Sequence, residues 1–437
     1  MTDCSKSADL FPALRSQKIE VDFKGGDISS DGGSLLLRQV DRRIGLTRDI
    51  DRVLFDSRRK RSCEHRQVHM LRQRVYGLAL GYEDLNDHDT MRHDLLFRAS
   101  VEAQQPLASS STLCRFENRA DRQMAVGLHS VLVDKFIASY KRAPKRLVLD
   151  FDATDDPIHG QQEGRFFHGF YRHYCFLPLY VFCDSQLLVG YLRPSDIDGA
   201  RHAWAILRLL VSRLRKAWPK VQIIFRGDSG FCRWRMLRWC EKHRVGYIVG
   251  LAKNDRVNTM AEPWVTEAME AFEKTGKKQR VFSEVNYGAL SWDHPRRVIV
   301  KAEHGPMGSN PRYVVTNLPG DPQKLYDEIY CQRGDMENRI KEQQLGLFSD
   351  RTSCHRWWPN PLRLLLSGLA YVLLDTIRRI ALKGTELARA QCTTIRLKLL
   401  KIGAIVLSNT RRIRIHLASA YPYQDLFSKV AMRLALE

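Results

Sequence analysis

Residues 146–253 carry the pattern that most restricts the fold of this chain. Three apolar runs typical of strands come first: RLVLDFDAT, YCFLPLYVFCD and LLVGYLRPS. An amphipathic helix follows, and then a strand, a second helix and a last strand: ARHAWAILRLLVSRLRKAW, VQIIF, CRWRMLRWCEKH and GYIVGLAK. This order predicts a hairpin meander that continues into right-handed α/β crossovers, and hence an α/β fold.

Two of these predicted strands end at aspartates. In RLVLDFDAT, strand alternation places Val148, Asp150 and Asp152 on one face, opposite Leu147, Leu149 and Phe151. Two acids on one face of a buried strand are unfavourable unless a cation compensates them. Asp228 follows VQIIF in the turn RGDSGF. Because the ends of neighbouring strands in an open α/β sheet form sites, we expect Asp152 and Asp228 to share one.

A third acid lies in the segment YCQRGDMENRIKE, residues 330–342. On an α-helix this segment forms a polar stripe of Tyr330, Arg333, Glu337 and Lys341, beside an apolar stripe of Ile329, Met336, Ile340 and Leu347. A salt-bridged surface helix has the same appearance. If Glu337 instead converges with Asp152 and Asp228, the three carboxylates form an all-oxygen site suited to Mg²⁺ or Mn²⁺. Two such ions support phosphoryl transfer.

The formal net charge of +21 over 437 residues predicts a polyanionic partner, either nucleic acid or an anionic membrane. The chain has no apolar run long enough to span a bilayer, and its first residues lack the blocks of a signal peptide. These features predict a soluble cytoplasmic protein that does not bind a membrane. The ten cysteines show no zinc-finger spacing. In NDHDTMRHD, capping and surface pairing explain His88, Asp89, His93 and Asp94 better than a metal site.

The flanking regions differ from this centre. Residues 1–145 are predicted to be mostly helical, and LASSSTLCRFENR is a candidate second helix of a helix-turn-helix. Residues 254–320 are predicted to be mostly β, with one helix near 263–275. After a helical layer, TIRLKLLKIGAIVLSNTRRIRIHLAS predicts a hairpin with basic strand faces, which include Arg396 and Lys398 on the first strand and Arg412, Arg414 and His416 on the second. The charges suit either DNA backbone or protection of an edge strand.

The sequence resembles the DDE transposases of bacterial insertion sequences. The group numbered 1380 is the most similar, through LDFDATDDPIHGQQEGRFFHGFY, FRGDSGF, YEDLNDHD and YCQRGDMENRIKE. The resemblance implies a ribonuclease H-like catalytic domain, with a mixed sheet flanked by helices, a β-rich insertion and a mainly helical N-terminal region. It selects Asp152, Asp228 and Glu337 as the catalytic residues that bind two divalent ions, Mg²⁺ or Mn²⁺.

The same resemblance implies DNA contacts. Tyr330 and Arg333 match the Y-x(2)-R-x(3)-E signature that ends at Glu337. The lysine that follows in this branch falls at Gln344, so Lys341 is the substitute candidate. Trp292, in the insertion, is a candidate for stacking on a flipped base near the transposon end, although a core tryptophan has the same appearance.

We therefore expect a five-part chain that cleaves DNA at transposon ends and transfers the freed 3′-hydroxyl into target DNA, with a homodimer bound to terminal inverted repeats. The expected parts are an N-terminal DNA-end-binding region, the first part of the catalytic domain, the insertion, the remainder of the catalytic domain with the Glu337 helix, and a basic C-terminal region, at residues 1–145, 146–253, 254–320, 321–380 and 381–437. A ribonuclease H-like nuclease without strand transfer, and a non-catalytic domesticated DNA-binding protein, are the alternatives.

Overall fold

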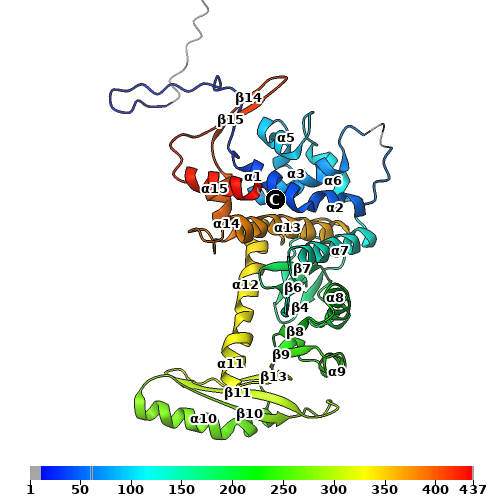
Figure 1. Cartoon of the computed structure of the whole chain (residues 1–437), viewed down its shortest axis with the longest axis vertical. Coiled ribbons are helices and arrows are strands. Elements are labelled where there is room, and N and C mark those ends of the chain that lie inside the picture. The colour runs from blue at the N-terminus through cyan, green and yellow to red at the C-terminus, as the bar shows by residue number, and fades with distance from the viewer. Residues whose placement is uncertain (1–10, 60, 62, 436–437) are drawn as a thin grey trace, which may run out of the picture.

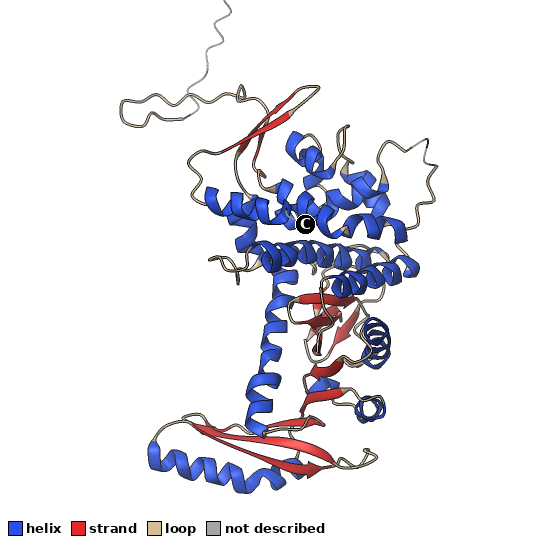
Figure 2. Cartoon of the chain, viewed as in Figure 1, coloured by secondary structure: helices blue, strands red, loops and turns tan. Residues whose placement is uncertain are grey.

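A nine-stranded mixed sheet forms the centre of the computed structural model, which describes residues 11–59, 61 and 63–435 (Figures 1 and 2). The strand order is β10-β11-β13-β9-β8-β2-β6-β7, and β12 pairs with β11. The strands are β2 (Arg146–Ala153), β6 (Leu179–Cys183), β7 (Gln186–Tyr191), β8 (Gln222–Gly227), β9 (Gly246–Leu251), β10 (Gln279–Tyr287), β11 (Arg296–Gly305), β12 (Gly308–Ser309) and β13 (Arg312–Thr316). β8 runs parallel to β2 and β9, whereas the other neighbours are antiparallel. The expectation of an α/β fold with a mixed sheet is confirmed.

Helices cover one face of the sheet because each strand sends alternate apolar side chains to it. The helices are α8 (Ala203–Ala217), α9 (Trp234–Lys242) and α10 (Asp255–Thr275). Leu147, Leu149 and Phe151 of β2 share one core with Ile223 and Phe225 of β8 and with the buried sides of these helices. The expected alternation of β2 is therefore correct, and Asp150 and Asp152 face the other side of the sheet.

A continuous helical segment of varying pitch crosses that other side. It comprises α11 (Pro322–Lys324), η3 (Leu325–Tyr330), η4 (Cys331–Arg333), α12 (Gly334–Lys341) and η5 (Glu342–Gly346), and we call it the long helix (yellow in Figure 1). Leu325 and Tyr326 pack on Ile224, Ile248 and Val314 of the sheet. Met336, Ile340 and Leu347 are buried in a second core. The apolar stripe expected on this helix is thus what attaches it to the fold.

The segment between β9 and the long helix extends the central sheet instead of forming a separate one. β13 pairs with β9, β11 pairs with β13, and β10 pairs with β11 at the edge. The expected helix near 263–275 is longer at its start, because α10 begins at Asp255. Asn254 caps it by accepting a hydrogen bond from the Val257 backbone N–H at 3.1 Å. Pro263 lies inside the helix, where it removes only one backbone hydrogen bond.

Most of the N-terminal region forms helices that pack around α13 (Pro359–Thr376). They are α1 (Ser34–Ile44), α2 (Leu46–Val53), α3 (Gln67–Leu80), α4 (Asp87–Met91), α5 (Leu95–Val101), α6 (Ser110–Glu117) and α7 (Arg122–Ala138). Asp94 caps α5 through the Phe97 N–H at 2.8 Å, and Asp89 accepts from the Ser110 N–H at the start of α6. These acids therefore cap helices, as expected. Residues 1–10 lie outside the described part.

The C-terminal hairpin is shorter than expected, because its first half is helical. Residues 392–400 form α14 (Cys392–Ile395) and η7 (Arg396–Leu400), and the hairpin consists of β14 (Ala404–Ser408) and β15 (Ile413–Leu417) with β1 (Ile28–Ser29) beside β14. Arg396 and Lys398 are therefore not on a strand face, and that prediction is wrong. Ile395, Leu399 and Leu400 are buried at helical spacing in the large core, which overrides the apparent alternation.

The last helix, α15 (Gln424–Ala435), packs on α1 and on η6 (Ile377–Ala381). Among residues 11–435 that are described, no helix combines the length and the apolar character needed to cross a membrane.

Arg396 tests the corrected assignment of this segment. Its buried guanidinium donates to the carbonyl oxygens of Leu78 and Ala79, at the end of α3, and of Gly346, at 3.1, 2.8 and 2.5 Å. Arg396→Ala leaves these acceptors without the donor, so we expect a loss of about 2–4 kcal/mol in the free energy of unfolding. Arg414→Ala, on exposed β15, should change it by less than about 0.5 kcal/mol in the same urea titrations. Equal effects of both substitutions would contradict the helical assignment.

Candidate active site

The register of two parallel strands brings Asp152 and Asp228 to the same edge of the sheet. β2 and β8 pair with Phe151 opposite Gly227, so the aspartate that follows each of these residues lies at the carboxyl end of its strand. Asp152 accepts a hydrogen bond from the Ala153 N–H at 3.0 Å. Asp228 begins the short helix η2 (Ser229–Phe231) and accepts from the Gly230 N–H at 2.9 Å. Both carboxylates are therefore held close to their own backbone.

Two residues before Asp152 and Asp228 on the same strands, Asp150 and Arg226 form a buried ion pair. They are opposite each other in the register, and the guanidinium donates to both carboxylate oxygens, at 2.6 Å for Nη2–Oδ2. The guanidinium also donates to the Ile329 carbonyl oxygen of the long helix. Asp150 thus has its cation within the protein, whereas Asp152 is the acid of this strand face left at the open edge. The structure therefore gives these two acids different surroundings.

Glu337 reaches this edge from the long helix. Met336 and Ile340 of the same helix are buried, which turns Glu337 toward the sheet edge with its side chain 45% exposed. Arg333, one turn earlier, donates to Glu337 at 2.7 Å and to Asp152 at 3.4 Å. Asp152 and Glu337 therefore share one guanidinium, although they lie on elements far apart in the chain.

The electrostatics of this cluster are dominated by the burial of Asp152. Burial raises the pKa of Asp152 to about 7, against the opposing effect of Arg333, and the negative charges of Asp228 and Glu337 raise it further. All three acids are thus within electrostatic reach of one another. A single arginine does not supply enough positive charge to keep this carboxyl fully ionised at neutral pH.

Tyr330, also on the long helix, packs on β9 next to the turn that carries Asp228. Its hydroxyl packs so closely over Gly250 of β9 that a Cβ on Gly250 would lie 2.7 Å from the hydroxyl and 2.9 Å from the Ser229 nitrogen. The glycine therefore allows both the tyrosine and the Asp228 turn to lie on β9. Burial raises the pKa of Tyr330 as well. Tyr330 is half-buried in this arrangement.

The two positions considered for the lysine that follows the signature glutamate, Lys341 and Gln344, have different surroundings. Lys341 is exposed and makes no hydrogen bond or ion pair with any residue that the structure describes. Gln344, at the expected lysine position, donates instead to the Asp155 carbonyl oxygen at 2.9 Å. It therefore ties the long helix to the loop that follows Asp152.

Trp292 is not brought to the carboxylates. It packs against Tyr287, with ring centroids 5.6 Å apart, and the Arg296 guanidinium lies 5.4 Å from its ring centre. β11 runs parallel to β9 and begins at Arg296, after Trp292. The tryptophan thus precedes the amino end of its strand, whereas Asp152 and Asp228 lie at the carboxyl ends of theirs. Its contact with DNA stays a prediction.

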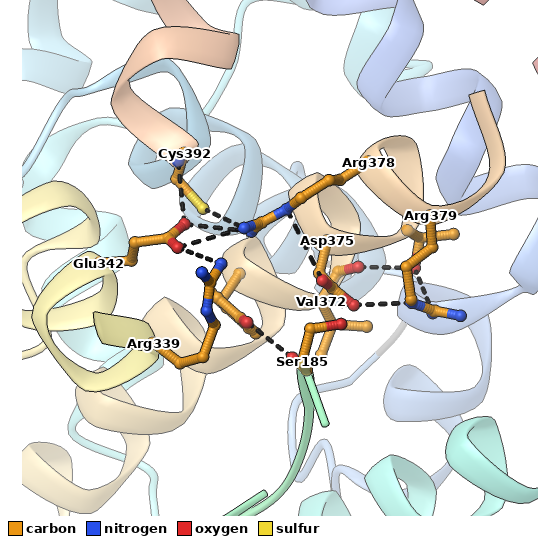
Figure 3. Close-up of polar contacts among 10 residues, drawn as sticks. Ser185, Arg339, Glu342, Val372, Asp375, Arg378, Arg379 and Cys392 are labelled. Carbon is orange, nitrogen blue, oxygen red and sulfur yellow. Dashed lines mark hydrogen bonds and ion pairs between the residues drawn. The ribbon is translucent and has the colours of Figure 1, made fainter. Parts of the chain in front are cut away.

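A buried ionic network fixes the far end of the long helix (Figure 3). Glu342 accepts two hydrogen bonds from Arg378 at 3.1 and 3.0 Å, one from the Cys392 N–H at 2.9 Å, and another from Arg339. Although burial opposes ionisation, the charge of Arg378 lowers the pKa of Glu342 overall. Glu337 therefore lies between two fixed points of its helix, Ile329 and Glu342.

Sequence reasoning missed Arg226 and Glu342. A signal for Arg226 was present, because Arg226 and Asp228 have the same i, i+2 spacing as Asp150 and Asp152 on the neighbouring predicted strand. Residues with this spacing share one face of a strand. For Glu342 the only local signal was Arg339, three residues earlier on the helix, since its other partners, Arg378 and Cys392, are distant in sequence.

The donor set suits a hard divalent cation. Carboxylate oxygens of Asp152, Asp228 and Glu337 are the ligands that Mg²⁺ and Mn²⁺ prefer, and the raised pKa of Asp152 reflects a deficit of positive charge that such ions relieve. The described residues contain no ready-made group of three ligands, and Arg333 bonds to two of the three acids. Arg333 therefore supplies the positive charge that faces Asp152 and Glu337 in this structure.

Comparison with known proteins identifies the family of this chain. The family model described as "Transposase DDE domain group 1" matches residues 11–437. The chain is therefore a DDE transposase by class, and it belongs to the DDE domain group 1 family. A similar solved structure is the cryo-EM structure of the piggyBac transposase synaptic complex with hairpin DNA, at 12% identity and a TM-score of 0.40, over 93% of this chain and 82% of that one. A search of curated proteins finds no match.

Asp152 makes the stability of the metal-free protein depend on pH. Its pKa rises from 3.8 in the unfolded chain to about 7 in the fold, so the native state binds more protons between these values and loses stability as pH rises through them. We expect Asp152→Asn to stabilise the protein relative to wild type at pH 8, by about 2–4 kcal/mol, and to have little effect at pH 4. Urea unfolding across this range measures the difference. Asp134→Asn, at an exposed carboxylate, is the control and should not stabilise the protein at pH 8. If Asp152→Asn does not stabilise it at pH 8 either, the raised pKa assigned to Asp152 is refuted.

Proposed function

We propose that this chain cleaves DNA at the ends of a transposon and joins the freed 3′-hydroxyl to target DNA, with Asp152, Asp228 and Glu337 as its catalytic residues. The observation that carries the proposal is the meeting of these acids at the carboxyl edge of two parallel strands, where Arg333 bonds to two of them. Membership of the DDE transposase family gives the reaction class. The positive net charge of +21 suits a DNA substrate.

The three carboxylates would hold two divalent cations, Mg²⁺ or Mn²⁺. Such ions supply activation of a water or 3′-hydroxyl and stabilisation of the leaving oxygen in phosphoryl transfer. Asp152, with a pKa of about 7, is only partly ionised at pH 7 without them and would ionise fully as a ligand. Arg333, released from Asp152 and Glu337, would then meet a phosphate of the cut strand.

Further parts of the proposal concern the partners and the fold class. Exposed Lys341 would contact DNA phosphates beside Arg333, while Tyr330 supports the helix and Trp292 contacts DNA elsewhere. The region 146–253 with 321–380 would form a ribonuclease H-like catalytic domain, and 254–320 its insertion. Residues 1–145 would bind the transposon ends, with the basic region 381–437 at the C-terminus. The chain would act as a homodimer on inverted repeats, as a member of the insertion-sequence group numbered 1380.

The catalytic assignment is tested by removing each acid in turn. Asp152→Asn, Asp228→Asn and Glu337→Gln should each abolish Mg²⁺-dependent cleavage of DNA that carries the element's own ends, because each removes one charged ligand. End binding, measured by gel shift, should persist. Asp335→Asn is the matched control, since Asp335 is an exposed acid on the same helix as Glu337. It should cleave as wild type does.

Retained cleavage in all three variants would overturn the assignment. A plasmid target in the same reaction separates the two chemical steps. Cleavage without joining to the plasmid would assign a nuclease, and end binding without cleavage by wild type would assign a DNA-binding protein.

Lys341 is tested through the salt dependence of DNA binding. If it contacts a phosphate, Lys341→Ala should weaken binding for every sequence and reduce the slope of log K against log salt concentration by about 1. Lys324→Ala, at an exposed lysine of the same long helix near its start, should leave the slope unchanged. Fluorescence anisotropy at several salt concentrations measures both. An unchanged slope for Lys341→Ala would remove this residue from the DNA surface.

A further inference from the structure

The loop after Asp152 carries a group of exposed aromatic side chains. Residues 156–176 form a separate three-stranded sheet, from β3 (Asp156–Pro157), β4 (Phe166–His168) and β5 (His173–Phe176). Its β4–β5 hairpin exposes four aromatic rings, which we call the aromatic tip: Phe166, Phe167, Phe170 and Tyr174. Phe170 is 83% exposed and Phe167 is 58% exposed. Such a concentration of apolar rings in water marks a binding surface.

The root of this hairpin is firmly attached to the rest of the protein. Ser195 donates to the Phe166 carbonyl oxygen at 2.9 Å, and the Glu163 N–H donates to the His355 carbonyl oxygen at 2.9 Å. The ring of Trp357 packs edge-on against Phe176, with centroids 5.3 Å apart. The aromatic tip is therefore presented by a fixed support.

The hairpin lies beside the candidate catalytic acids. His173 of β5 is 2.8 Å from the carboxylate of Asp155, three residues after Asp152. Burial raises the pKa of Tyr171, in the turn of the hairpin, to about 12, with further contributions from the charges of Asp155, Asp152 and Asp228. Tyr171 packs against Phe170, with ring centroids 5.0 Å apart. A chain of contacts thus leads from Asp155, in the loop that follows Asp152, through His173 and Tyr171 to Phe170 of the aromatic tip.

Basic side chains accompany the rings. The Arg165 guanidinium lies 4.8 Å from the ring centre of Tyr174, and Tyr174 pairs across the strands with Phe167, at 5.7 Å between ring centroids. Arg172 is exposed in the turn. Exposed rings flanked by arginines are the combination that binds unpaired nucleotides, because bases stack on the rings and phosphates pair with the cations.

We propose that the aromatic tip is a binding site for unpaired nucleotides of the DNA strand held at Asp152, Asp228 and Glu337, with Phe167 and Phe170 as stacking residues. This inference rests on the proposed function, since it takes the acids as the place where the strand is cut. A base that leaves the duplex next to the cut has no stacking partner, and the tip supplies one. The site thereby favours DNA whose end is opened over DNA that is fully paired.

A binding experiment tests the site without any need for cleavage. Protein carrying Glu337→Gln is titrated with a DNA duplex that ends in a short unpaired tail containing 2-aminopurine, and with the same duplex lacking the tail. Stacking should quench the fluorescence of 2-aminopurine, and the tailed duplex should bind more tightly. Adding Phe167→Ala or Phe170→Ala should weaken binding of the tailed duplex about tenfold and abolish quenching, with the blunt duplex unaffected.

Two matched variants accompany these substitutions. Phe170→Trp keeps an aromatic ring and should retain both quenching and affinity. Trp204→Ala removes a ring that is 45% exposed on α8, on the face of the sheet opposite Asp152, and it should bind the tailed duplex as the parent protein does. Because Phe167 and Phe170 are both exposed, their replacement should not lower the thermal midpoint of unfolding.

Unchanged quenching and affinity in Phe167→Ala and Phe170→Ala would overturn the proposal. So would unchanged DNA binding together with loss of self-association in sedimentation, because the tip would then be a contact between protein copies. Absence of cleavage by the wild-type protein would instead refute the proposed function and leave this binding result standing, so the two failures are distinguishable.

Discussion

The buried ion pair of Asp150 and Arg226 is the interaction on which the site depends. Both side chains are nearly inaccessible to water, so each charge requires the other. A shift of one residue between β2 and β8 would turn one partner to the opposite face and leave two unpaired buried charges. The register in which Asp152 and Asp228 end their strands together is therefore enforced by the pair that precedes them.

The same arginine connects the sheet to the long helix through the Ile329 carbonyl oxygen. Further along, Glu342 binds Arg378 and the Cys392 backbone, which belong to the helical layer around α13. Glu337 lies between these attachments, which fix the helix on either side of it. A metal site needs its ligands held to a fraction of an ångström, and two fixed points on one helix provide that constraint.

The chain as a whole and the candidate site differ in the sign of their charge. The chain as a whole is strongly positive and attracts a polyanion over long distances. The cluster around Asp152 is locally short of positive charge, even with Arg333 present, because the carboxyl group is removed from water. The proposed reaction requires this combination of a positively charged chain and an acidic centre, because it needs DNA and divalent cations at the same place.

The sequence by itself determined the local features: the alternation of β2, the aspartates at the ends of β2 and β8, and the buried seam of Met336 and Ile340 beside Glu337. These follow from periodicity, which is a property of neighbouring residues. Prediction from periodicity failed where contacts with distant residues decide the secondary structure. Burial of Ile395 and Leu399 made residues 392–400 helical despite an alternating pattern, and the Asn254 cap started α10 before Pro263.

Only the tertiary structure decided which charges pair. Arg226 with Asp150, Arg378 with Glu342, and Arg333 with both Asp152 and Glu337 are choices that strand register and helix packing make between residues far apart in the chain. The exposure of Phe167 and Phe170 was likewise invisible in the sequence, because phenylalanine is ordinarily buried and only the complete fold shows that nothing in the described chain covers these two rings.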